Sequence, residues 1–290
     1  MPTALPTDTT IDATTTSDAR LRSLDIAIPA KPDVLVRLSL LLADDLVDNP
    51  RVAQLISADM ALASAVLKAV NAPLYGLSGR VQSVQQAVTY LGTRDITAIT
   101  FELGLRAAFP PAPELEPIWD RAAERGLWMG RLALALGLDA WAAHSAGLFE
   151  ECGKAVLFKH APDDYRDLLV QTGAEGEHDG ALCALEMERF GLSHDALGAA
   201  LCETWGLGAP AVASVRHHVI ARHQPSLPDQ AAAPALIVLS VLVHALMHWP
   251  DRIDKVALSL APQAGLDPTQ VQRALRKLQD QAAAAQAHRP

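Results

Sequence analysis

The amino-acid sequence predicts an all-α fold, a compact multi-helix domain with an extra helical segment at its C-terminal end. Hydrophobic residues make up 50% of the 290 residues but aromatic residues only 4%. The apolar content is therefore mainly aliphatic, rich in the Ala and Leu that favour helices over strands. Apolar residues recur three and four positions apart, and no sustained alternation of period two is present. The high apolar fraction also excludes a wholly disordered chain.

Proline and N-cap residues indicate where the first helices begin. One helix is predicted from about Pro32 and a second after Pro50, because proline suits the first helical turn. Asp59 is placed to cap a third helix, which ends at Asn71 because Pro73 cannot continue it. Apolar residues follow helical spacing in all three segments: Val34, Leu35, Leu38, Leu41, Leu42; Val52, Leu55, Ile56; Leu62, Val66, Leu67, Val70.

A capping box and a glycine define the next two predicted helices. Ser83 to Gln86 reads SVQQ, which matches the box at the start of a helix. Gly92 is expected to end that helix, and Thr93 to cap another that runs to about residue 108. Four prolines between positions 110 and 117 then form a rigid connector, so the main internal boundary is predicted here.

Further helices are predicted throughout the rest of the chain. Their expected ranges are 117–136, 139–150, 152–160, 162–172, 180–190, 193–205, 210–223, 228–249 and 268–287, the last capped by Asp267. The stretch 231–249 is long enough to span a membrane, but Pro234, Ser240, His244 and His248 interrupt it. We therefore expect a buried core helix and no membrane insertion.

Charge and cysteine usage narrow the class of protein. The formal net charge is −9 and the isoelectric point about 5.5, which disfavours a nucleic-acid partner because phosphate binding needs a basic surface. Three cysteines without a CxxC pair, Cys152, Cys183 and Cys202, disfavour a disulfide scaffold and fit a reducing cytoplasm. Residues 1–18, rich in Thr, Asp and Pro, lack signal-peptide features and are predicted to be a disordered tail.

Several spaced motifs resemble the HDOD (HD-related output) domain, an all-helical relative of the HD-type metal-dependent phosphohydrolases. The resemblance covers roughly Leu24 to His223. It is carried by Ser57–Leu62, Leu67–Gly76, Val84–Val88, Leu91-Gly92, Ile118-Trp119, Ala146–Leu148, Gly153–Leu157, Phe190–His194, Gly198, Trp205–Leu207 and Arg216–His218. It implies one helical domain over 19–223, with an N-terminal half to about 109 and an HD-like half from about 117. Residues 224–290 are then helices that pack on this domain or mediate a homodimer.

The resemblance also locates three positions at which catalytic relatives bind metal. The first falls on Arg121, whose cationic guanidinium has no lone pair to ligate a metal. The His-Asp pair falls on Glu150 and Glu151, which are able to bind hard metals but stand beside that arginine. We therefore expect no catalytic residues, no metal and no cofactor. The two glutamates are expected either to face water or to form a salt bridge with Arg121 in the former metal pocket.

Histidines and the N-terminal motif offer further candidate residues. His217 and His218 are assigned to the relict pocket. Together with nearby His223 and upstream His194 they offer a second possible metal site, as do His244 and His248 on one helical face, but hydrogen-bonded core or rim histidines are the expected outcome. Structural roles are also expected for a motif whose alternative role is partner docking: Asp59, Asn71, Tyr75, Gly76 and Gln86.

The sequence thus favours a non-enzymatic bacterial regulatory module that acts through protein–protein contacts in the cytoplasm. The resemblance implies links with two-component or cyclic-diguanylate signalling. A sensor kinase, response regulator or GGDEF-type protein would then act in trans, because no receiver, GGDEF or EAL signature is present. Two alternatives stay open: a divergent metal-dependent phosphohydrolase, or a nucleotide sensor that uses Arg121 in the relict pocket.

Overall fold

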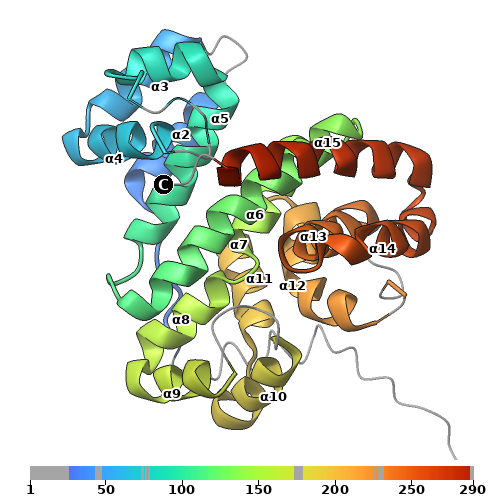
Figure 1. Ribbon diagram of the computed structural model, residues 1–290. Helices are drawn as coiled ribbons and strands as arrows, with labels where there is room; N and C mark the ends of the chain where they lie inside the picture. The colour runs from blue at the N-terminus through green and yellow to red at the C-terminus, as the bar shows by residue number, and fades with distance from the viewer. Residues whose placement is uncertain are drawn as a thin grey trace, which may run out of the picture.

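The computed structural model describes residues 26–42, 48–72, 75, 77, 79–172, 179–224, 226–227 and 232–287. These residues form α-helices and short 3₁₀ turns joined by loops, with no strand among them, so the predicted all-α class is confirmed. The predicted tail at 1–18 and Gly76 lie outside the described residues. Figure 1 shows three regions: an N-terminal lobe, a central bundle and a C-terminal helical layer.

Four helices build the N-terminal lobe, and their ends follow the predicted caps. The elements are α2 (Asp33–Leu42), α3 (Asn49–Ser57), α4 (Met60–Val70) and the first part of α5 (Val84–Ala107). The Asp59 carboxylate accepts hydrogen bonds from the first-turn amides of α4. Ser83 and Gln86 form the capping box of α5, with Gln86 accepting from the Gln82 amide.

Gly92 divides α5 into two helices that meet at a kink, as the sequence predicts. Its φ of 81° and ψ of 167° break the helical path, a conformation that glycine adopts at low cost. Before the break, Val84 and Val88 pack into the apolar core of the N-terminal lobe. Well after it, Phe101 and Leu105 belong to the core of the central bundle. The helix therefore passes from one core to the next.

The central bundle contains the helices that surround the candidate site. They are η2 (Pro113–Leu115), α6 (Glu116–Ala135), α7 (Ala140–Phe149), α8 (Cys152–His160), α9 (Pro162–Thr172), α10 (Asp179–Phe190), α11 (His194–Thr204) and α12 (Ala209–His223). Each α-helix begins and ends within two residues of its predicted range. A boundary between domains at 109–117 stays a prediction, and the change from one apolar core to the next occurs inside α5.

The C-terminal helices cover the side of the bundle formed by α6 and α12. They are α13 (Pro234–His248), η3 (Pro250–Arg252), α14 (Ile253–Leu260), η4 (Ala261–Ala264) and α15 (Pro268–Ala287), and α14 was not predicted. α13 packs against α6, α7 and α12, while α15 lies along α6 (Figure 1). Trp128, Met129 and Leu132 of α6 share one apolar core with the buried residues of α13. A homodimer role for this segment stays a prediction.

The lengths and hydropathy of the helices show whether one of them could span a membrane. Among the described residues, no single helix is both long and apolar enough to cross a bilayer, although α3 and α4 pass by length and composition as a pair bent by 118°.

A close helix crossing yields the first prediction. A Cβ on Gly153 of α8 would lie 1.9 Å from the His194 carbonyl oxygen of α11 and 2.8 Å from the Gly198 amide nitrogen. Because backbone cannot yield as a flexible side chain does, Gly153→Ala should lower the free energy of unfolding by about 3 kcal/mol or more. Urea unfolding measures this loss.

Gly208→Ala is the matched control, since a Cβ at this position would lie 3.6 Å from Pro210 Cδ, an ordinary contact, and the φ of Gly208 is −64°. It should cost less than about 1 kcal/mol. Equal stability of the two variants would contradict the close crossing of α8 and α11.

Candidate functional site

Glu150 and Glu151 lie at the junction of α7 and α8, in the interior of the central bundle. Their side chains are 0% and 1% exposed, so the expectation that they face water is wrong. The alternative, a salt bridge with Arg121, is present: Arg121 Nη2 lies 3.4 Å from Glu151 Oε2. Arg121 reaches this contact from α6, with 14% of its side chain exposed.

The main partner of both glutamates is a residue that the sequence analysis missed, Arg125. It lies one helical turn after Arg121 on α6, and its side chain is 2% exposed. Arg125 Nε lies 3.0 Å from Glu150 Oε2, and Nη1 lies 2.7 Å from Glu151 Oε1. Arg125 Nε also donates to the Gly147 carbonyl at 2.8 Å. One guanidinium therefore occupies the space between the two carboxylates.

Three further residues close these contacts into a ring. Lys154 Nζ on α8 lies 3.8 Å from Glu151 Oε2 and 2.6 Å from Asp179 Oδ1 at the start of α10. Arg222 near the end of α12 contacts Asp179 Oδ2 at 3.1 Å and also pairs with Glu150. We call this closed circuit the charge ring. Its members, in alternating sign, are Glu150, Arg125, Glu151, Lys154, Asp179 and Arg222.

The charge ring is neutral and almost fully buried. Its three cations balance its three carboxylates, and each side chain is at most 3% exposed. Burial alone would raise the pKa of Glu151, but Arg125, Lys154 and Arg121 hold that pKa well below its usual range. Burial likewise opposes ionisation of Asp179, and Lys154 is the main cause that lowers its pKa. All three carboxylates have a cationic partner within hydrogen-bond reach.

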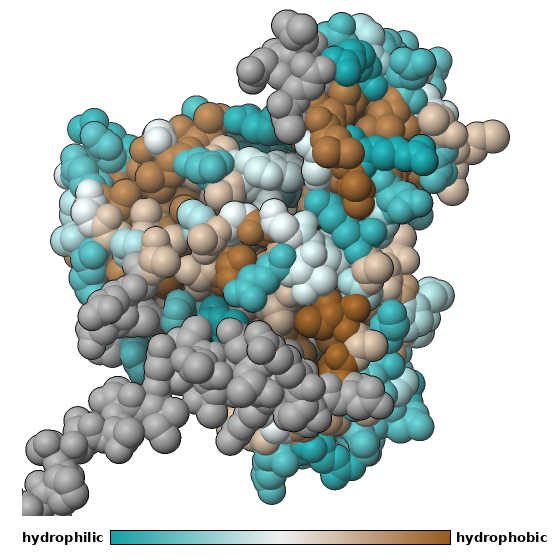
Figure 2. Space-filling model, turned by 180° about the vertical axis from the view of Figure 1, so that it is seen from behind, coloured by the Kyte–Doolittle hydropathy of each residue, from teal (hydrophilic) through white to brown (hydrophobic). Residues whose placement is uncertain are grey.

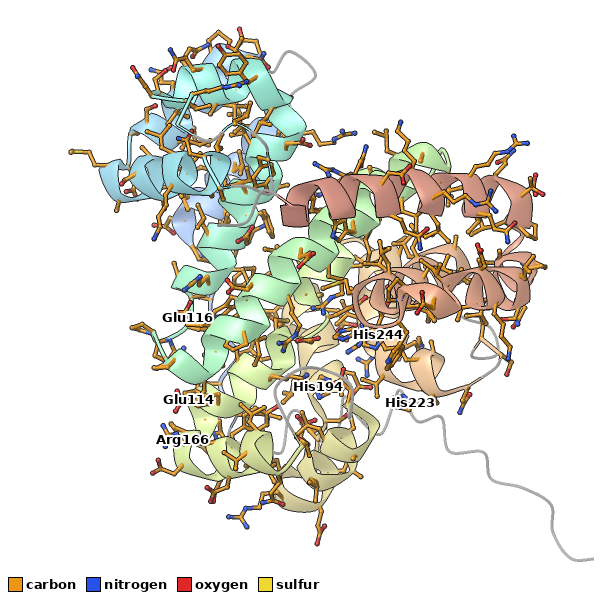
Figure 3. All side chains as sticks on the ribbon, in the orientation of Figure 1. Glu114, Glu116, Arg166, His194, His223 and His244 are labelled. Carbon is orange, nitrogen blue, oxygen red and sulfur yellow. The ribbon has the colours of Figure 1, made fainter. Side chains whose placement is uncertain are left out.

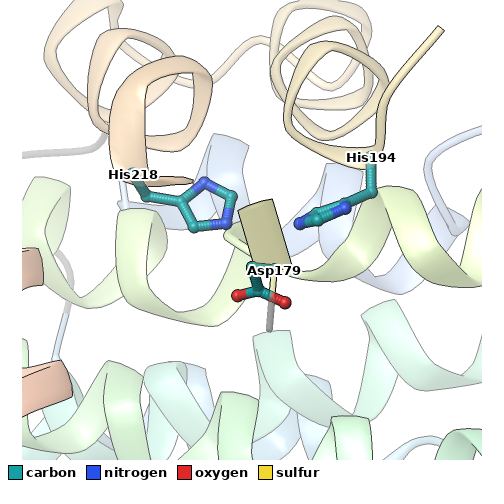
Figure 4. Close-up of side chains that lie close together, drawn as sticks. All are labelled: Asp179, His194 and His218. Carbon is teal, nitrogen blue, oxygen red and sulfur yellow. The ribbon is translucent and has the colours of Figure 1, made fainter. Parts of the chain in front are cut away.

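Beside the ring, two histidines and Asp179 form a second cluster (Figure 4). One possible ligand atom from each of Asp179, His194 and His218 lies within 4.8 Å of the others. His194 Nδ1 is 2.8 Å from Glu186 Oε2, and His218 Nδ1 is 2.6 Å from the Val215 carbonyl oxygen. The Nε2 atoms of both histidines are buried without a hydrogen-bond partner among the described residues.

The two imidazoles differ in charge. Burial alone would lower the pKa of His194, but the Glu186 carboxylate holds it well above the ordinary histidine value. Burial, with Arg222 as the next cause, lowers the pKa of His218 well below that value. Near neutral pH, His194 is therefore cationic and His218 neutral. His217 points elsewhere from the same helix, partly exposed, because neighbouring helical residues face different directions.

The donor set fits a metal ion only in part. Neutral His218 has the arrangement of a metal-ligating histidine, a free lone pair on Nε2 while Nδ1 donates to a carbonyl, whereas cationic His194 carries protons on both nitrogens and has no lone pair to offer. Both oxygens of Asp179, however, are already held by Lys154 and Arg222. A divalent ion here would lie close to these two cations, and at the Glu150–Glu151 pair it would displace Arg125. The charges present therefore do not fit a catalytic metal.

The other predicted residues have identifiable contacts. Asp59 and Gln86 serve as caps, as described above. The Asn71 side chain donates to the Leu67 and Val81 carbonyls and accepts from the Val81 amide, which ties the end of α4 to the loop before α5. Tyr75 lines a cavity between the N-terminal lobe and α6–α7. The His244 ring lies against that of His248, with centroids 4.5 Å apart and the planes tilted by 40°, and burial lowers the pKa of His244.

Ion pairs at the molecular edge provide a contrast to the ring. Figure 3 shows Glu114 and Arg166 at the periphery, whereas His194 lies inside the bundle. Arg166 Nε is 2.5 Å from Glu114 Oε1, with 43% of the arginine side chain exposed. Arg106 and Glu116 form another such pair, 40% and 47% exposed. Solvent screens pairs of this kind and leaves them with little effect on stability.

Arg125→Met should destabilise the fold strongly, because it leaves Glu150 and Glu151 buried without their shared cation. We expect a loss of about 3–5 kcal/mol in the free energy of unfolding, measured by urea denaturation at pH 7. Arg106→Met removes a cation from the exposed pair with Glu116 and should cost less than about 1 kcal/mol. Similar losses in the two variants would show that the ring does not stabilise the bundle as described.

The His194–Glu186 pair predicts a pH dependence above pH 6.5. The folded pKa of His194 is raised, so its contribution is complete below the unfolded value near 6.5 and is lost as the pH rises through the folded pKa. The free energy of unfolding should fall between about pH 7.5 and 8.5, with at most about 1.4 kcal/mol per pH unit coming from His194. His218, His144 and His244, whose pKa values are lowered, lose protons on folding and give an opposite slope around pH 6.5, which fades above about pH 7.5 because the unfolded histidines are then deprotonated.

Glu186→Gln should flatten this slope, because it removes the main cause of the raised pKa. Tyr165→Phe is the control, since the Tyr165 hydroxyl donates to Glu186 Oε1 at 2.5 Å and its loss leaves the carboxylate in place. A slope that persists unchanged in Glu186→Gln would assign the pH dependence to another group.

Known proteins share this fold over almost the whole chain. A protein from Marinobacter aquaeolei VT8, whose name proposes a role in signal transduction, is 21% identical to this chain. Its TM-score is 0.70, over 96% of this chain and 66% of that one. A Shewanella amazonensis SB2B protein named for a phosphohydrolase activity is 17% identical, with a TM-score of 0.66 over 94% and 97%. An HDOD domain protein of unknown function from Geobacter sulfurreducens is 20% identical, with a TM-score of 0.66 over 93% and 96%.

The sequence comparisons point to one family. An uncharacterised protein of Treponema pallidum (strain Nichols) is 28% identical over 202 residues, which are 68% of this chain but only 39% of that protein. The chain thus spans well under half the length of this relative. The profile of the HDOD domain matches residues 28–221, from the segment before α2 to the last turn of α12. With this match over two thirds of its length, the chain belongs to the HDOD domain family.

Proposed function

We propose that the chain is a non-enzymatic regulatory module of bacterial signal transduction that acts through protein–protein contacts. The observation that carries this proposal is the charge ring. Arg125 lies between Glu150 and Glu151, where a catalytic relative would hold metal, and Arg121 replaces the first metal-ligand position. Metal-activated water is the nucleophile of HD-type hydrolysis, and guanidinium groups neither ligate a metal nor replace it in that step.

The surface of the N-terminal lobe supports a role in binding a partner. Figure 2 shows a mixed apolar and polar surface on this lobe, seen from behind. Leu40 is 70% exposed and Val36 40%. Leu40 also lines an open groove between α2 and α3, flanked by Arg37 and Arg51. Exposed apolar side chains rimmed by charged ones are typical of protein interaction sites.

The partner would act in trans, in the cytoplasm. A sensor kinase, a response regulator or a GGDEF-type protein is the class we favour, and cyclic-diguanylate turnover is the pathway in which such a contact would operate. The name of the Marinobacter protein, which mentions signal transduction, is consistent with this class. Binding would act by stabilising one of two states of the partner.

The alternative, a divergent phosphohydrolase, is favoured by one observation, the Asp179–His194–His218 cluster. Both hypotheses are tested on the intact chain purified without a histidine tag. We expect no stoichiometric zinc, iron or manganese, and no turnover of phosphodiesters or nucleotides with added Mn²⁺ or Mg²⁺. Partners captured from the native organism should then bind the purified chain directly, and Leu40→Ser should weaken that binding.

Matched variants keep the test decisive. Metal-dependent turnover that disappears in His194→Ala or Glu151→Gln, in variants whose circular dichroism is unchanged, would overturn the proposal in favour of the enzyme. Leu258→Ser is the control for Leu40→Ser, because Leu258 is also exposed, at 56%, but lies on α14. Equal weakening by both substitutions would remove the α2–α3 surface from the proposal.

A further inference from the structure

A cavity lies at the junction of the N-terminal lobe and the central bundle, away from the charge ring. The space that the centres of water-sized groups can occupy is about 30 Å³, enough for about two such groups, and the volume is about 400 Å³ when the solvent at the open mouth is included. The N-terminal side contributes Tyr75, from the loop after α4, and Arg94 and Asp95 from α5. The bundle contributes Arg131 from α6, and Trp141 and His144 from α7, so charged groups meet an aromatic wall here.

One cation that lines the cavity, Arg131, has no anionic side chain in contact with it among the described residues. Asp95 Oδ1 lies 3.4 Å from Arg94 Nε, so these two charges pair with each other. The Arg131 guanidinium lies 5.1 Å from the centre of the Trp128 ring, and among the described residues it makes no hydrogen bond or ion pair. A guanidinium has five N–H donors, and an oxyanion is the group that satisfies them in pairs.

A neutral donor and an aromatic wall complete the site. The Tyr75 hydroxyl makes no hydrogen bond to a described residue, and burial raises its pKa, so it stays protonated and able to donate. Trp141 stands edge-on against Phe101, with ring centroids 5.4 Å apart, and lies nearly parallel to His144 at 6.0 Å. Burial lowers the pKa of His144 to about 4, so this neighbour is neutral. The Trp141 ring is thus held by two aromatic contacts while remaining partly exposed.

We infer that this cavity binds a small phosphate ester that carries a planar ring, such as a mononucleotide. Two of the phosphate oxygens occupy the space for water-sized groups, and Arg131 and Tyr75 donate hydrogen bonds to them. The planar ring lies in the open mouth and packs on the indole of Trp141. Asp95 remains paired with Arg94, so the bound phosphate neutralises Arg131. No covalent step is involved.

Because the cavity lies between the N-terminal lobe and the central bundle, a bound ligand would affect how these two parts are held together. It would touch Tyr75 and α5 on one side and α6 and α7 on the other, so its binding would hold the N-terminal lobe against the central bundle. This inference goes beyond the proposed partner binding and does not depend on it, because the ligand is measured on the isolated chain.

Isothermal titration calorimetry of the full chain, at low ionic strength without phosphate buffer, tests the site with AMP, GMP and inorganic phosphate. We expect saturable binding of at least one mononucleotide, with weaker binding of inorganic phosphate because it lacks the ring. Arg131→Ala and Tyr75→Phe should each raise the Kd, at least tenfold for the arginine. Trp141→Leu should weaken the mononucleotide but not inorganic phosphate.

Two control variants assign the site. Arg276→Ala removes an exposed arginine on α15 and should leave the Kd unchanged. Arg121→Ala should also leave it unchanged, because Arg121 belongs to the charge-ring region. Absence of binding to the folded chain, binding unaffected by Arg131→Ala, or binding lost only in Arg121→Ala would each overturn the inference, the last by placing the ligand in the relict pocket.

Discussion

The charge ring is the constraint on which the arrangement of the central bundle depends. Its six side chains come from α6, the α7–α8 junction, α8, α10 and α12, and each ion is paired on both sides. An ion transferred from water to a protein interior loses several kcal/mol of solvation, and only well-formed pairs offset that cost. The helices must therefore keep the positions at which all six contacts form together. A buried ring of this kind specifies one arrangement more than it adds net stability.

The ring sets strict requirements on the helices that carry it. Arg125 reaches Glu150 and Glu151 only because α6 and α7 approach closely, and Gly147 lies at that crossing with Met129 Sδ 2.8 Å from the position of a Cβ. Gly153 performs the same role between α8 and α11, against the carbonyl of His194. Glycine is thus needed beside the ring for its lack of a side chain, not for its backbone freedom. The buried charges and the close helix crossings explain each other.

Local signals in the sequence were sufficient for most helices but not for the ring. Caps such as Asp59 and Ser83 act within four residues, so one sequence reveals them. α14 was missed because it is short and follows a proline-containing turn without a clear cap. Arg121, Glu150 and Glu151 were found through a family motif. Asp179 and Arg222 were not, because they are 43 residues apart and meet only through the tertiary fold.

The burial of Glu150 and Glu151 likewise depends on contacts between residues that are distant in the sequence. The family motif places Glu150 and Glu151 at positions where catalytic relatives have metal ligands, but the solvation of a carboxylate depends on which cations reach it. In the sequence, Arg125 is a helical arginine one turn after Arg121. Only the packing of α6 in the bundle shows that its side chain points into the interior. Carboxylates in a low-dielectric interior need cations beside them, and in this bundle Arg125, Lys154 and Arg222 neutralise the carboxylates of the ring. Under the proposed function, the surface of the fold and not this ring carries the activity.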